Sequence, residues 1–372
     1  MTLQKINVKD IRPDRILKKI YQLAKFCKAH HSPLTFKYYL SLIYYFRLRI
    51  EKGFRHDEIF SLGLLSSPLS DENSNKYISQ NEFKKILWTI NGNLSRMGKW
   101  IIVSMNKGIF YAFCKNLNLP IPKMYAILFR DFLSVSYITN SSLLNNDKLI
   151  EFIKNELPEE FVIKPLLGEG GEFVNTYITG NDGIIDHLGN IKTERAIYES
   201  IKNNKKYDSF IVQERLKNHP YFLKISPSEN LHTIRIITLV NSSNQCEILN
   251  GHISIATSQK IASQQGDLKI NISLDDGILE YGIFSDHNEG GFKKITKHPE
   301  TGRSFKEFKL PFWEDVISLS KEAALKFLPL RTLGWDIAIT EKGPTLLETN
   351  TSYYPPNNFE QMDKFVKYLI TS

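Results

Sequence analysis

Short, mostly apolar runs rich in β-branched and aromatic residues recur along the chain between polar segments, which is typical of β-strands. The clearest run is Leu231–Val240 (LHTIRIITLV), in which Thr233 and Arg235 share one face. Further strands are predicted at 99–104 (KWIIVS), 124–129 (MYAILF), 161–165, 173–178 and 209–216, and within 246–284 around predicted turns at Asn250-Gly251 and Asp275-Asp276-Gly277.

Longer segments repeat their apolar residues every three to four positions, as amphipathic helices do. The predicted helices are 15–30, 36–49, 106–117, 146–156, 192–203, 311–327 and 358–369. A polar stretch at 66–80 (SSPLSDENSNKYISQ) predicts a boundary before Met97. We therefore expect a mainly helical N-terminal region over 1–96 and a second domain over 97–372.

The run from Gly334 to Asn350 (GWDIAITEKGPTLLETN) predicts a β-hairpin that turns at 341–344. Pairing of its strands brings Asp336 near Glu348, with Asn350 on the same face as Glu348. Two carboxylates and an amide oxygen suit Mg²⁺. The alternative is a surface hairpin whose acidic residues face water, but the apolar neighbours of these residues favour burial, and buried carboxylates need a cation or a hydrogen-bond partner.

Composition places the chain among soluble globular proteins. Its 372 residues are 42% hydrophobic and 24% charged, and this length predicts two or three packed units. The cysteines Cys27, Cys114 and Cys246 are too scattered for a disulfide framework or a zinc site, which favours a reducing cytoplasm. We expect neither a signal peptide nor a membrane-spanning helix.

The net charge of +8 is concentrated at one end of the chain. Residues 1–60 hold thirteen Lys or Arg against five Asp or Glu, so the rest of the chain sums to zero. Three interpretations remain open for this basic region. It is a helical cap with a solvated face, a docking segment for an anionic membrane or glycan, or a nucleic-acid contact, although no nucleic-acid motif accompanies the charge.

Lysines and glycines form a second group of candidate residues. Lys107 stands at the start of a predicted helix, where backbone donors and the helix dipole also favour an anion. Lys164 lies near the end of a strand that precedes Gly168-Glu169-Gly170-Gly171. Such a loop can lay N–H groups over phosphates, although glycine clusters also make plain turns. The spacing excludes a P-loop, a protein kinase glycine loop and a Rossmann motif.

Two further strands carry polar residues where a ligand can meet them. The strand 209–216 turns polar at its end, where backbone groups can meet an adenine edge. Arg235 on a central strand is costly unless it meets an anion, which is either a ligand or a structural carboxylate. Lys269 and Asn271 can face the same site.

The order of these motifs resembles the ATP-grasp superfamily. The similarity is greatest to its sugar-transfer-associated branch and covers roughly residues 97–360. The sequence segments that carry it are FVIKP, GEGG, IVQERL, LHTIRIIT, GWDIAIT and GPTLLETN. The resemblance implies an α+β fold in which two α+β subdomains clasp ATP. A lid or hinge subdomain would span about 160–215, and a Mg-binding subdomain about 216–372.

The resemblance also implies roles for individual residues. Lys107, Lys164 and the loop Gly168, Glu169, Gly170 and Gly171 would hold the phosphates of ATP. Arg235, with Lys164, would serve catalysis at the γ-phosphate. Adenine and ribose contacts would come from Gln213, Glu214, Arg215, Leu216 and His219, and the Mg²⁺ ligands would be Asp336, Glu348 and Asn350. At Asn271 the sequence departs from the pattern, because the acidic residue expected beside it is missing.

The activity implied is that of an ATP-dependent carboxylate–amine ligase acting through an acyl phosphate, with ATP and Mg²⁺ as cofactors. It would form an amide on a polysaccharide precursor or an amino acid, with small-molecule or glycan carboxylates and amines as partners and no nucleic acid. The protein would act in the cytoplasm. Its basic N-terminal region would allow association with a membrane surface or a glycan-assembly complex. The alternatives are a kinase acting on a sugar hydroxyl and a catalytically silent nucleotide-binding scaffold of a glycan-assembly complex. A protein without catalytic activity would not need to keep all four candidate site residues, which are Lys164, Asp336, Glu348 and Asn350.

Overall fold

The strand predicted at 99–104 is helical in the structure, a computed structural model. The structure describes residues 36–65, 74, 77–91, 100–138, 142–168, 170–181, 183–256, 267–286 and 291–353. Residues 100–105 form helical turns, and the Asn106 N–H donates to the Ile102 carbonyl at 3.0 Å. A short apolar run is compatible with either period, and its sequence alone does not decide between them.

The chain divides into two units. The first comprises Met1–Ile86, Ile283–Lys294 and Tyr354–Thr371, and the second comprises Leu87–Gly282, Ile295–Tyr353 and Ser372. The predicted helices at 15–30 and 358–369 lie outside the described residues. No helix within the described part of the chain is long and apolar enough to cross a bilayer.

The described part of the first unit is mainly helical, with strand segments only at 283–286 and 291–294. It contains α2 (Phe36–Ile50), which confirms the prediction for 36–49, α3 (His56–Ser61) and most of α5 (Gln80–Ile90). Its core is apolar and is built from Tyr44, Tyr45, Leu48, Phe54, Ile59, Leu64 and Leu65. The Tyr45 hydroxyl and the His56 Nδ1 are 2.9 Å apart, so the polar tip of this buried tyrosine has a partner.

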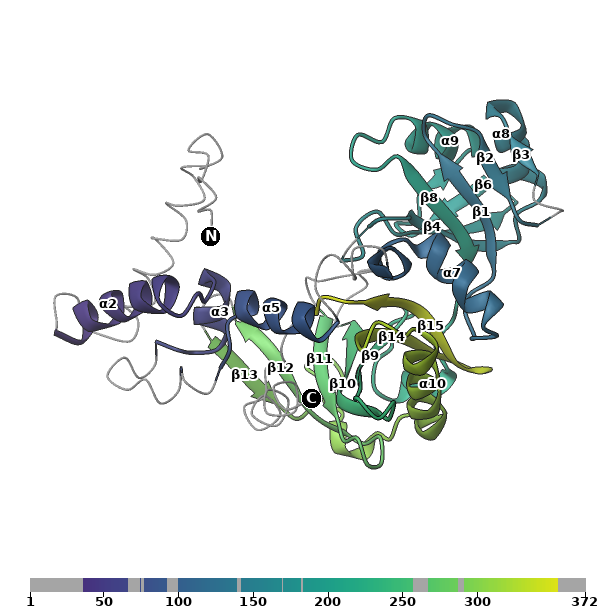
Figure 1. Cartoon of the computed structure of the whole chain (residues 1–372). Coiled ribbons are helices and arrows are strands. Elements are labelled where there is room, and N and C mark those ends of the chain that lie inside the picture. The colour runs from purple at the N-terminus through teal and green to yellow at the C-terminus, as the bar shows by residue number, and fades with distance from the viewer. Residues whose placement is uncertain are drawn as a thin grey trace. The chain divides into compact units, whose positions relative to one another are not determined.

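An eight-stranded sheet forms one part of the second unit, in the order β3-β2-β1-β8-β4-β5-β6-β7. Its strands are β1 (Met124–Phe129), β2 (Ser134–Ser136), β3 (Leu143–Leu144), β4 (Glu160–Pro165), β5 (Asn175–Gly180), β6 (Gly183–Asp186), β7 (Ile191–Lys192) and β8 (Ser209–Glu214). Helices α8 (Asn146–Asn155) and α9 (Glu194–Lys202) pack side by side (Figure 1) and bury Phe152 and Ile197 against this sheet.

A seven-stranded antiparallel sheet carries the largest core, in the order β13-β12-β11-β10-β9-β14-β15. Its strands are β9 (Thr233–Val240), β10 (Cys246–Ala256), β11 (Asp267–Ile272), β12 (Leu279–Asp286), β13 (Gly291–Ile295), β14 (Thr332–Thr340) and β15 (Gly343–Asn350). The short 3-10 helices are η2 (Pro220–Lys224) and η3 (Phe305–Glu307). The fold is therefore α+β, as the sequence predicts.

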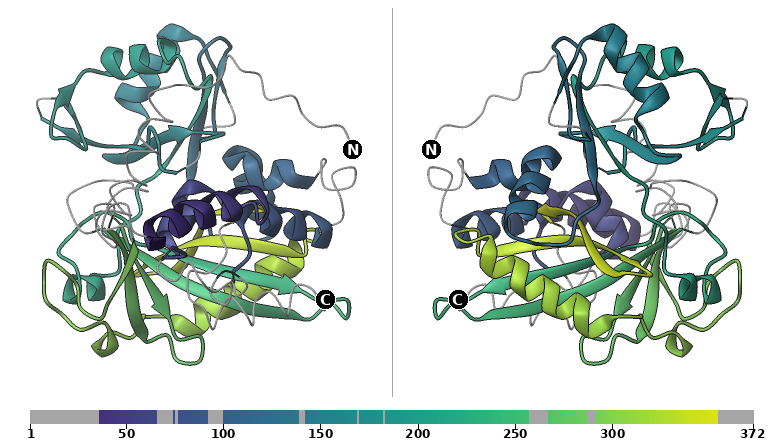
Figure 2. Two further views of the ribbon diagram at one scale, coloured as in Figure 1. Left: turned by 90° about the vertical axis from the view of Figure 1, so that its left-hand side faces the viewer. Right: turned by 90° about the vertical axis from the view of Figure 1, so that its right-hand side faces the viewer.

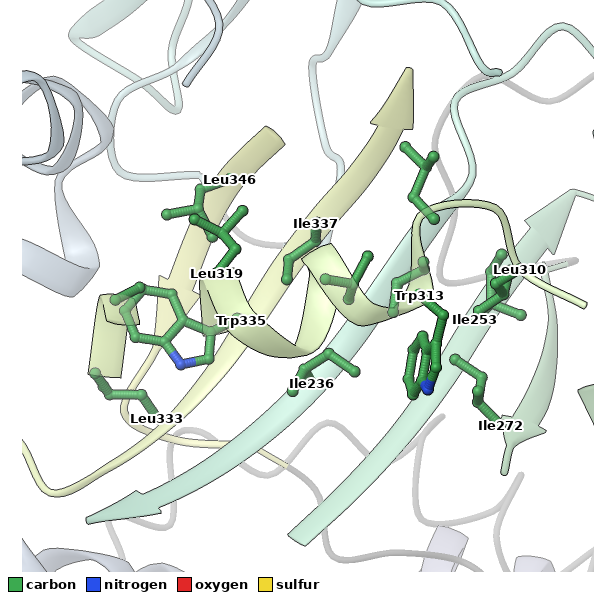
Figure 3. Packing of buried hydrophobic residues seen from close by; sticks show 14 of the residues in the cluster. Ile236, Ile253, Ile272, Leu310, Trp313, Leu319, Leu333, Trp335, Ile337 and Leu346 are labelled. Carbon is green, nitrogen blue, oxygen red and sulfur yellow. The ribbon is translucent and has the colours of Figure 1, made fainter. Parts of the chain in front are cut away.

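Helix α10 (Trp313–Lys326) covers one face of this sheet along β9, β10 and β14 (Figures 1 and 2). Glu314 and Asp315 lie in its first turn and Lys326 in its last, which complements the helix dipole. Figure 3 shows its Leu319 beside the apolar side chains of the strands. The opposite face of the sheet is thereby left for polar residues.

The turn predicted at Asn250-Gly251 is wrong, because both residues lie inside β10. The register between β10 and β9 shifts between Ile248 and Asn250, so a bulge absorbs one residue there. Gly251 is required for packing, because an added Cβ would lie 3.2 Å from both Ile236 Cδ1 and Leu274 Cδ2. The turn at Asp275-Asp276-Gly277 is confirmed, and Gly277 has a φ of +76°.

The hairpin of β14 and β15 is confirmed and is tighter than predicted. Its strands extend to Thr340 and from Gly343, which leaves a turn of Glu341 and Lys342 alone. Pro344 is tolerated inside β15 because this strand lies at the edge of the sheet.

Candidate functional site

A row of five polar side chains crosses the seven-stranded sheet. Glu348 on β15 lies opposite Asp336 on β14, which lies opposite Arg235 on β9. Arg235 in turn lies opposite His252 on β10, and His252 lies opposite Asn271 on β11. Directly opposed residues share a face of a sheet, so all five project from the face that α10 leaves uncovered.

The alternation of residues along each strand produces this row. Ile236 and Trp335 occupy the positions next to Arg235 and Asp336, and both are fully buried in the core beneath α10 (Figure 3). A slip of one residue in the register would expose the core and bury the charges. The hydrophobic core therefore fixes which face the charged side chains occupy.

Arg235 and Asp336 form a two-pronged ion pair. The Arg235 Nε donates to Asp336 Oδ1 at 2.5 Å, and its Nη2 donates to Oδ2 at 2.8 Å. Asn350 adds a weak contact from its Nδ2 to Asp336 Oδ2 at 3.4 Å. The arginine on the central strand thus meets a carboxylate, which is one of the two anions that the sequence allows.

Lys107 joins the row to the glycine loop. Its Nζ lies 3.1 Å from Glu348 Oε2 and donates to the Gly168 carbonyl at 2.7 Å. Asn106 positions this lysine, because its side chain accepts from the N–H groups of Gly108 and Ile109 and so caps α7 (Lys107–Asn116). The predicted start of this helix is confirmed.

The glycine loop has a backbone that few other residues can adopt. Gly170 and Gly171 have φ values of +65° and +73°, in the left-handed region. Glu169 lies outside the described residues. β5 begins at Asn175, two residues later than the predicted start at Phe173, whose own φ is +55°.

Lys164 is buried beside Tyr111 of α7. The Lys164 Nζ donates to the Tyr111 hydroxyl at 3.2 Å, and that hydroxyl lies 2.9 Å from Gln213 Oε1 and 3.2 Å from the Leu347 carbonyl. Burial, reinforced by the positive charge of Lys107, lowers the pKa of Lys164 from 10.5 to about 7. This lysine can therefore take up a proton when an anion binds beside it.

The two carboxylates differ in their electrostatic surroundings. Burial raises the pKa of Asp336, and the nearby Glu348 raises it further, while Arg235 opposes both effects. Burial also acts to raise the pKa of Glu348, but Lys107 and Lys164 together outweigh it and lower that pKa. The buried carboxylate of Asp336 and the partly exposed carboxylate of Glu348, on adjacent strands, are therefore both held by cationic side chains.

The far end of the row differs in character. Asn271 is only 8% exposed, and its Nδ2 is buried without a hydrogen-bond partner within the part of the chain that is described. Burial, with the positive charges of Lys269 and Arg235, lowers the pKa of His252 well below 6.5. The row therefore passes from carboxylates through a guanidinium to two neutral groups that can donate hydrogen bonds.

The residues predicted to meet adenine and ribose have other contacts. Glu214 Oε2 accepts from the Lys123 N–H at 3.1 Å, and Arg215 lies 3.6 Å from Glu160. Leu216 is half-buried just beyond β8. The His219 Nδ1 accepts from the Tyr221 N–H at 3.2 Å and so caps η2. Of the predicted nucleotide-binding residues, Lys107 contacts Gly168 directly, and Lys164 and Gln213 meet through the Tyr111 hydroxyl.

Sequence reasoning missed two residues of this site. Tyr111 lies one turn after Lys107 on α7, and its helical spacing was the only available signal. His252 follows a predicted turn that does not exist, so its place opposite Arg235 could not be foreseen.

The donor set suits Mg²⁺ bound together with phosphates. Within the described residues, no cluster of three or more His, Cys, Asp or Glu could hold a metal ion. Asp336, Glu348 and Asn350 offer only oxygen atoms, and they would need phosphate oxygens to complete the shell, as Mg²⁺ sites with nucleotides do. The residues present therefore fit a Mg·ATP complex.

A small cavity of about 120 Å³ lies apart from this cluster. Ile163, Phe173 and Tyr177 line it, on the face of β4 opposite that of the adjacent Lys164. It is therefore no part of the nucleotide site described above.

The chain belongs to the sugar-transfer associated ATP-grasp family, whose model matches residues 97–365. This match confirms the family resemblance found in the sequence and the fold class that it implies. No curated protein matches the chain.

Solved structures of ATP-grasp enzymes resemble the chain only distantly. N5-carboxyaminoimidazole ribonucleotide synthetase, solved with ADP, has a TM-score of 0.37 at 12% identity, over 68% of this chain and 45% of its own. D-alanine–D-alanine ligase of Bacillus anthracis has a TM-score of 0.39 at 12% identity, over 72% and 67%. Biotin carboxylase of Campylobacter jejuni has a TM-score of 0.42 at 8% identity, over 72% and 47%.

The chain thus spans less than half the length of the first and third of these proteins. Their scores and identities are low, so the family match alone carries the assignment.

Proposed function

We propose that this protein is an ATP-dependent ligase that joins a carboxylate to an amine. The observation that carries the proposal is the polar row from Glu348 to Asn271, with Lys107 and Lys164 beside its acidic end. The family supports ATP as the energy source, because ATP-grasp proteins are known as carboxylate–amine ligases. The sugar-transfer association supports a glycan precursor as one substrate.

The acidic end of the row would hold Mg·ATP. Asp336, Glu348 and Asn350 would bind Mg²⁺, which would neutralise charge on the phosphates when bound. Lys107 and Lys164 would then turn from Glu348 and Tyr111 toward the phosphates, and the N–H groups of the glycine loop would cover them. Arg235 would contact the γ-phosphate from the middle of the row.

The neutral end would hold the substrate carboxylate. Asn271 Nδ2 is a buried donor without a described partner, and His252 lies between it and Arg235. A carboxylate that accepts from Asn271 and His252 would lie next to the phosphate held by Arg235. This placement converts a bimolecular encounter into a reaction between neighbours.

The chemistry needs no nucleophilic side chain. A carboxylate oxygen attacks the γ-phosphorus, the bond from that phosphorus to the bridging oxygen breaks, and ADP leaves. The amine nitrogen then attacks the acyl carbon, phosphate departs with the electron pair of the C–O bond, and the nitrogen loses a proton. Side chains of this site would position the reactants and balance their charge.

The proposed setting is the cytoplasm. Cys114 and Cys246 are both free thiols, and burial raises the pKa of Cys114 to about 12, so this thiol is unreactive. Neither thiol needs an oxidising compartment, which is consistent with access to cytoplasmic ATP.

The test is release of ADP from Mg·ATP with pairs of carboxylates and amines, including amino acids and acidic sugars. The proposal requires ADP and phosphate in equal amounts, with an amide product in the mass spectrum. ADP with a phosphorylated sugar and no free phosphate would make the protein a kinase instead. Thermal unfolding with Mg·ATP tests nucleotide binding by itself, because a ligand at ~100 times its Kd stabilises a protein by ~2.7 kcal/mol. A shift without any release of ADP would make the protein a silent nucleotide-binding scaffold.

A further inference from the structure

Helix α2 (Phe36–Ile50) has two apolar faces, and the described core uses only one of them. Tyr44, Tyr45 and Leu48 are buried and contribute to the core of the first unit. Because this face is held by the core, α2 cannot rotate to bury its other side. Among the residues that the structure describes, the second face therefore stays on the surface.

The second face is a narrow stripe of large apolar side chains. Ile43, Phe46 and Ile50 are 65%, 55% and 79% exposed, and Tyr39, at 49%, continues the line toward the N-terminus. Spacings of four, three and four residues place these positions on one line along a helix. Scattered exposed apolar residues need no explanation, but a continuous line of them marks an interaction surface.

Arginines flank the stripe on both sides. With 3.6 residues per turn, Arg47 lies roughly 70° to one side of the centre of the stripe and Arg49 roughly 90° to the other. Both arginine side chains are exposed. The sequence of α2 (FKYYLSLIYYFRLRI) contains three basic residues and no acidic one, and Glu51 just beyond the helix pairs with Arg47 at 2.9 Å. Helix α2 itself is therefore cationic.

We propose that this face of α2 docks the protein onto an anionic phospholipid surface. The helix would lie in the plane of the membrane, with Ile43, Phe46 and Ile50 entering the boundary between headgroups and acyl chains. Arg47 and Arg49 have apolar stems that follow the helix while their guanidinium groups reach lipid phosphates. Charge complementarity selects an anionic membrane among the possible occupants of an apolar stripe.

The docking surface on α2 shares no residue with the site on the seven-stranded sheet. A ligase that acts on a glycan precursor would gain from being held near a membrane. The docking surface nevertheless stands on the exposure and charge of α2, so it can fail or hold independently of the proposed reaction.

The test is flotation of the full chain with vesicles of phosphatidylcholine alone and of phosphatidylcholine mixed with phosphatidylserine. We expect the protein to float only with the mixed vesicles, and to do so less as salt is raised. The double variant Ile43→Ser/Phe46→Ser should lose at least tenfold in partitioning, because it removes the two largest central side chains of the stripe.

Matched controls exist on the same chain. Phe132→Ser/Leu188→Ser removes an aromatic and an aliphatic residue that are 75% and 73% exposed elsewhere, and it should float like the wild type. Arg47→Gln should weaken binding about fivefold, the effect of one basic residue near an anionic surface. Arg195→Gln should not, although Arg195 pairs with Glu199 at 3.0 Å much as Arg47 pairs with Glu51 at 2.9 Å.

Three results would overturn the proposal. The first is a wild type that does not float with anionic vesicles, and the second is a stripe variant that floats as well as the wild type. The third is a wild type that is dimeric by light scattering and becomes monomeric in the stripe variant without any lipid binding, which would make a second copy the occupant.

Discussion

Asp336 binds Arg235 through both carboxylate oxygens, at 2.5 Å and 2.8 Å, in the middle of a row of polar side chains. The same carboxylate is a proposed Mg²⁺ ligand. Arg235 therefore occupies Asp336 in the described state, and binding of a metal ion would have to share or replace that interaction. The pair thus couples the stability of the sheet to the nucleotide site.

Asp336→Asn should destabilise the fold by about 3–5 kcal/mol, because it leaves the Arg235 guanidinium buried without its counter-charge. Urea unfolding measures this loss. Asp131→Asn is the control, since Arg130 binds Asp131 through two nitrogens as well, but at the exposed surface. That variant should unfold close to the wild type. Equal stability of both variants would show that Arg235 has another way to meet its charge.

Glu348→Gln should abolish turnover while the fold persists. The amide oxygen can still accept from Lys107, whose Nζ lies 3.1 Å from Glu348 Oε2, but the negative charge that would bind Mg²⁺ is lost. ADP release together with circular dichroism measures both properties. Turnover at the wild-type rate would remove Glu348 from the proposed metal ligands.

Tyr111→Phe should lower both stability and ATP affinity. The change leaves Gln213 Oε1 and the Leu347 carbonyl without the hydroxyl that lies 2.9 Å and 3.2 Å from them, at a cost of about 1–3 kcal/mol. It also removes the acceptor of Lys164, so the lysine loses its position. Chemical denaturation and ATP titration give the two effects. If ATP affinity is unchanged, Tyr111 supports the fold alone.

Local pattern sufficed to predict the acidic end of the site. Asp336 and Glu348 lie on strands joined by a turn of two residues, so their approach follows from alternation and a short connection. Lys107 likewise follows from a local helix cap at Asn106. These features depend on neighbours in the sequence.

The rest of the row depends on the order of strands, which no local pattern encodes. Asp336 meets Arg235 because β14 pairs with β9, about a hundred residues earlier in the chain. The position of His252 could not be predicted, because the dipeptide Asn250-Gly251 favours a turn by itself. In the structure this dipeptide lies within a strand, next to a β-bulge. Tertiary packing of Trp313 and Leu274 around Gly251 outweighs that local preference.

ATP binding should take up a proton at about pH 8. Burial lowers the pKa of Lys164 to about 7, and bound phosphates would raise it again. ATP affinity should therefore fall as pH rises above 7. Titration calorimetry in two buffers with different ionisation enthalpies measures the uptake. Lys164→Arg should bind without it, because arginine stays charged. Equal uptake in that variant would assign the proton to another group.

The lowered pKa of Lys164 also determines the direction in which stability changes with pH. The folded pKa lies below the 10.5 of the free side chain, so the unfolded chain holds more protons between about pH 7 and 10.5. In this window the contribution of Lys164 to stability rises with pH, and below pH 7 the penalty for its buried charge is fully present. In Lys164→Met this part of the pH dependence should vanish from unfolding curves measured across that range.

Asn271→Leu should make the protein more stable and less active at once. The Asn271 Nδ2 is buried without a described partner, and such a group costs about 1–3 kcal/mol, which an apolar side chain of similar size avoids. Activity should fall, because this amide is the proposed donor to the substrate carboxylate. Asn250→Leu is the matched control, because Asn250 is equally buried but has a partner, so its loss should destabilise. If Asn271→Leu also destabilises, Asn271 belongs to the structure of the sheet, and the substrate carboxylate must be held elsewhere.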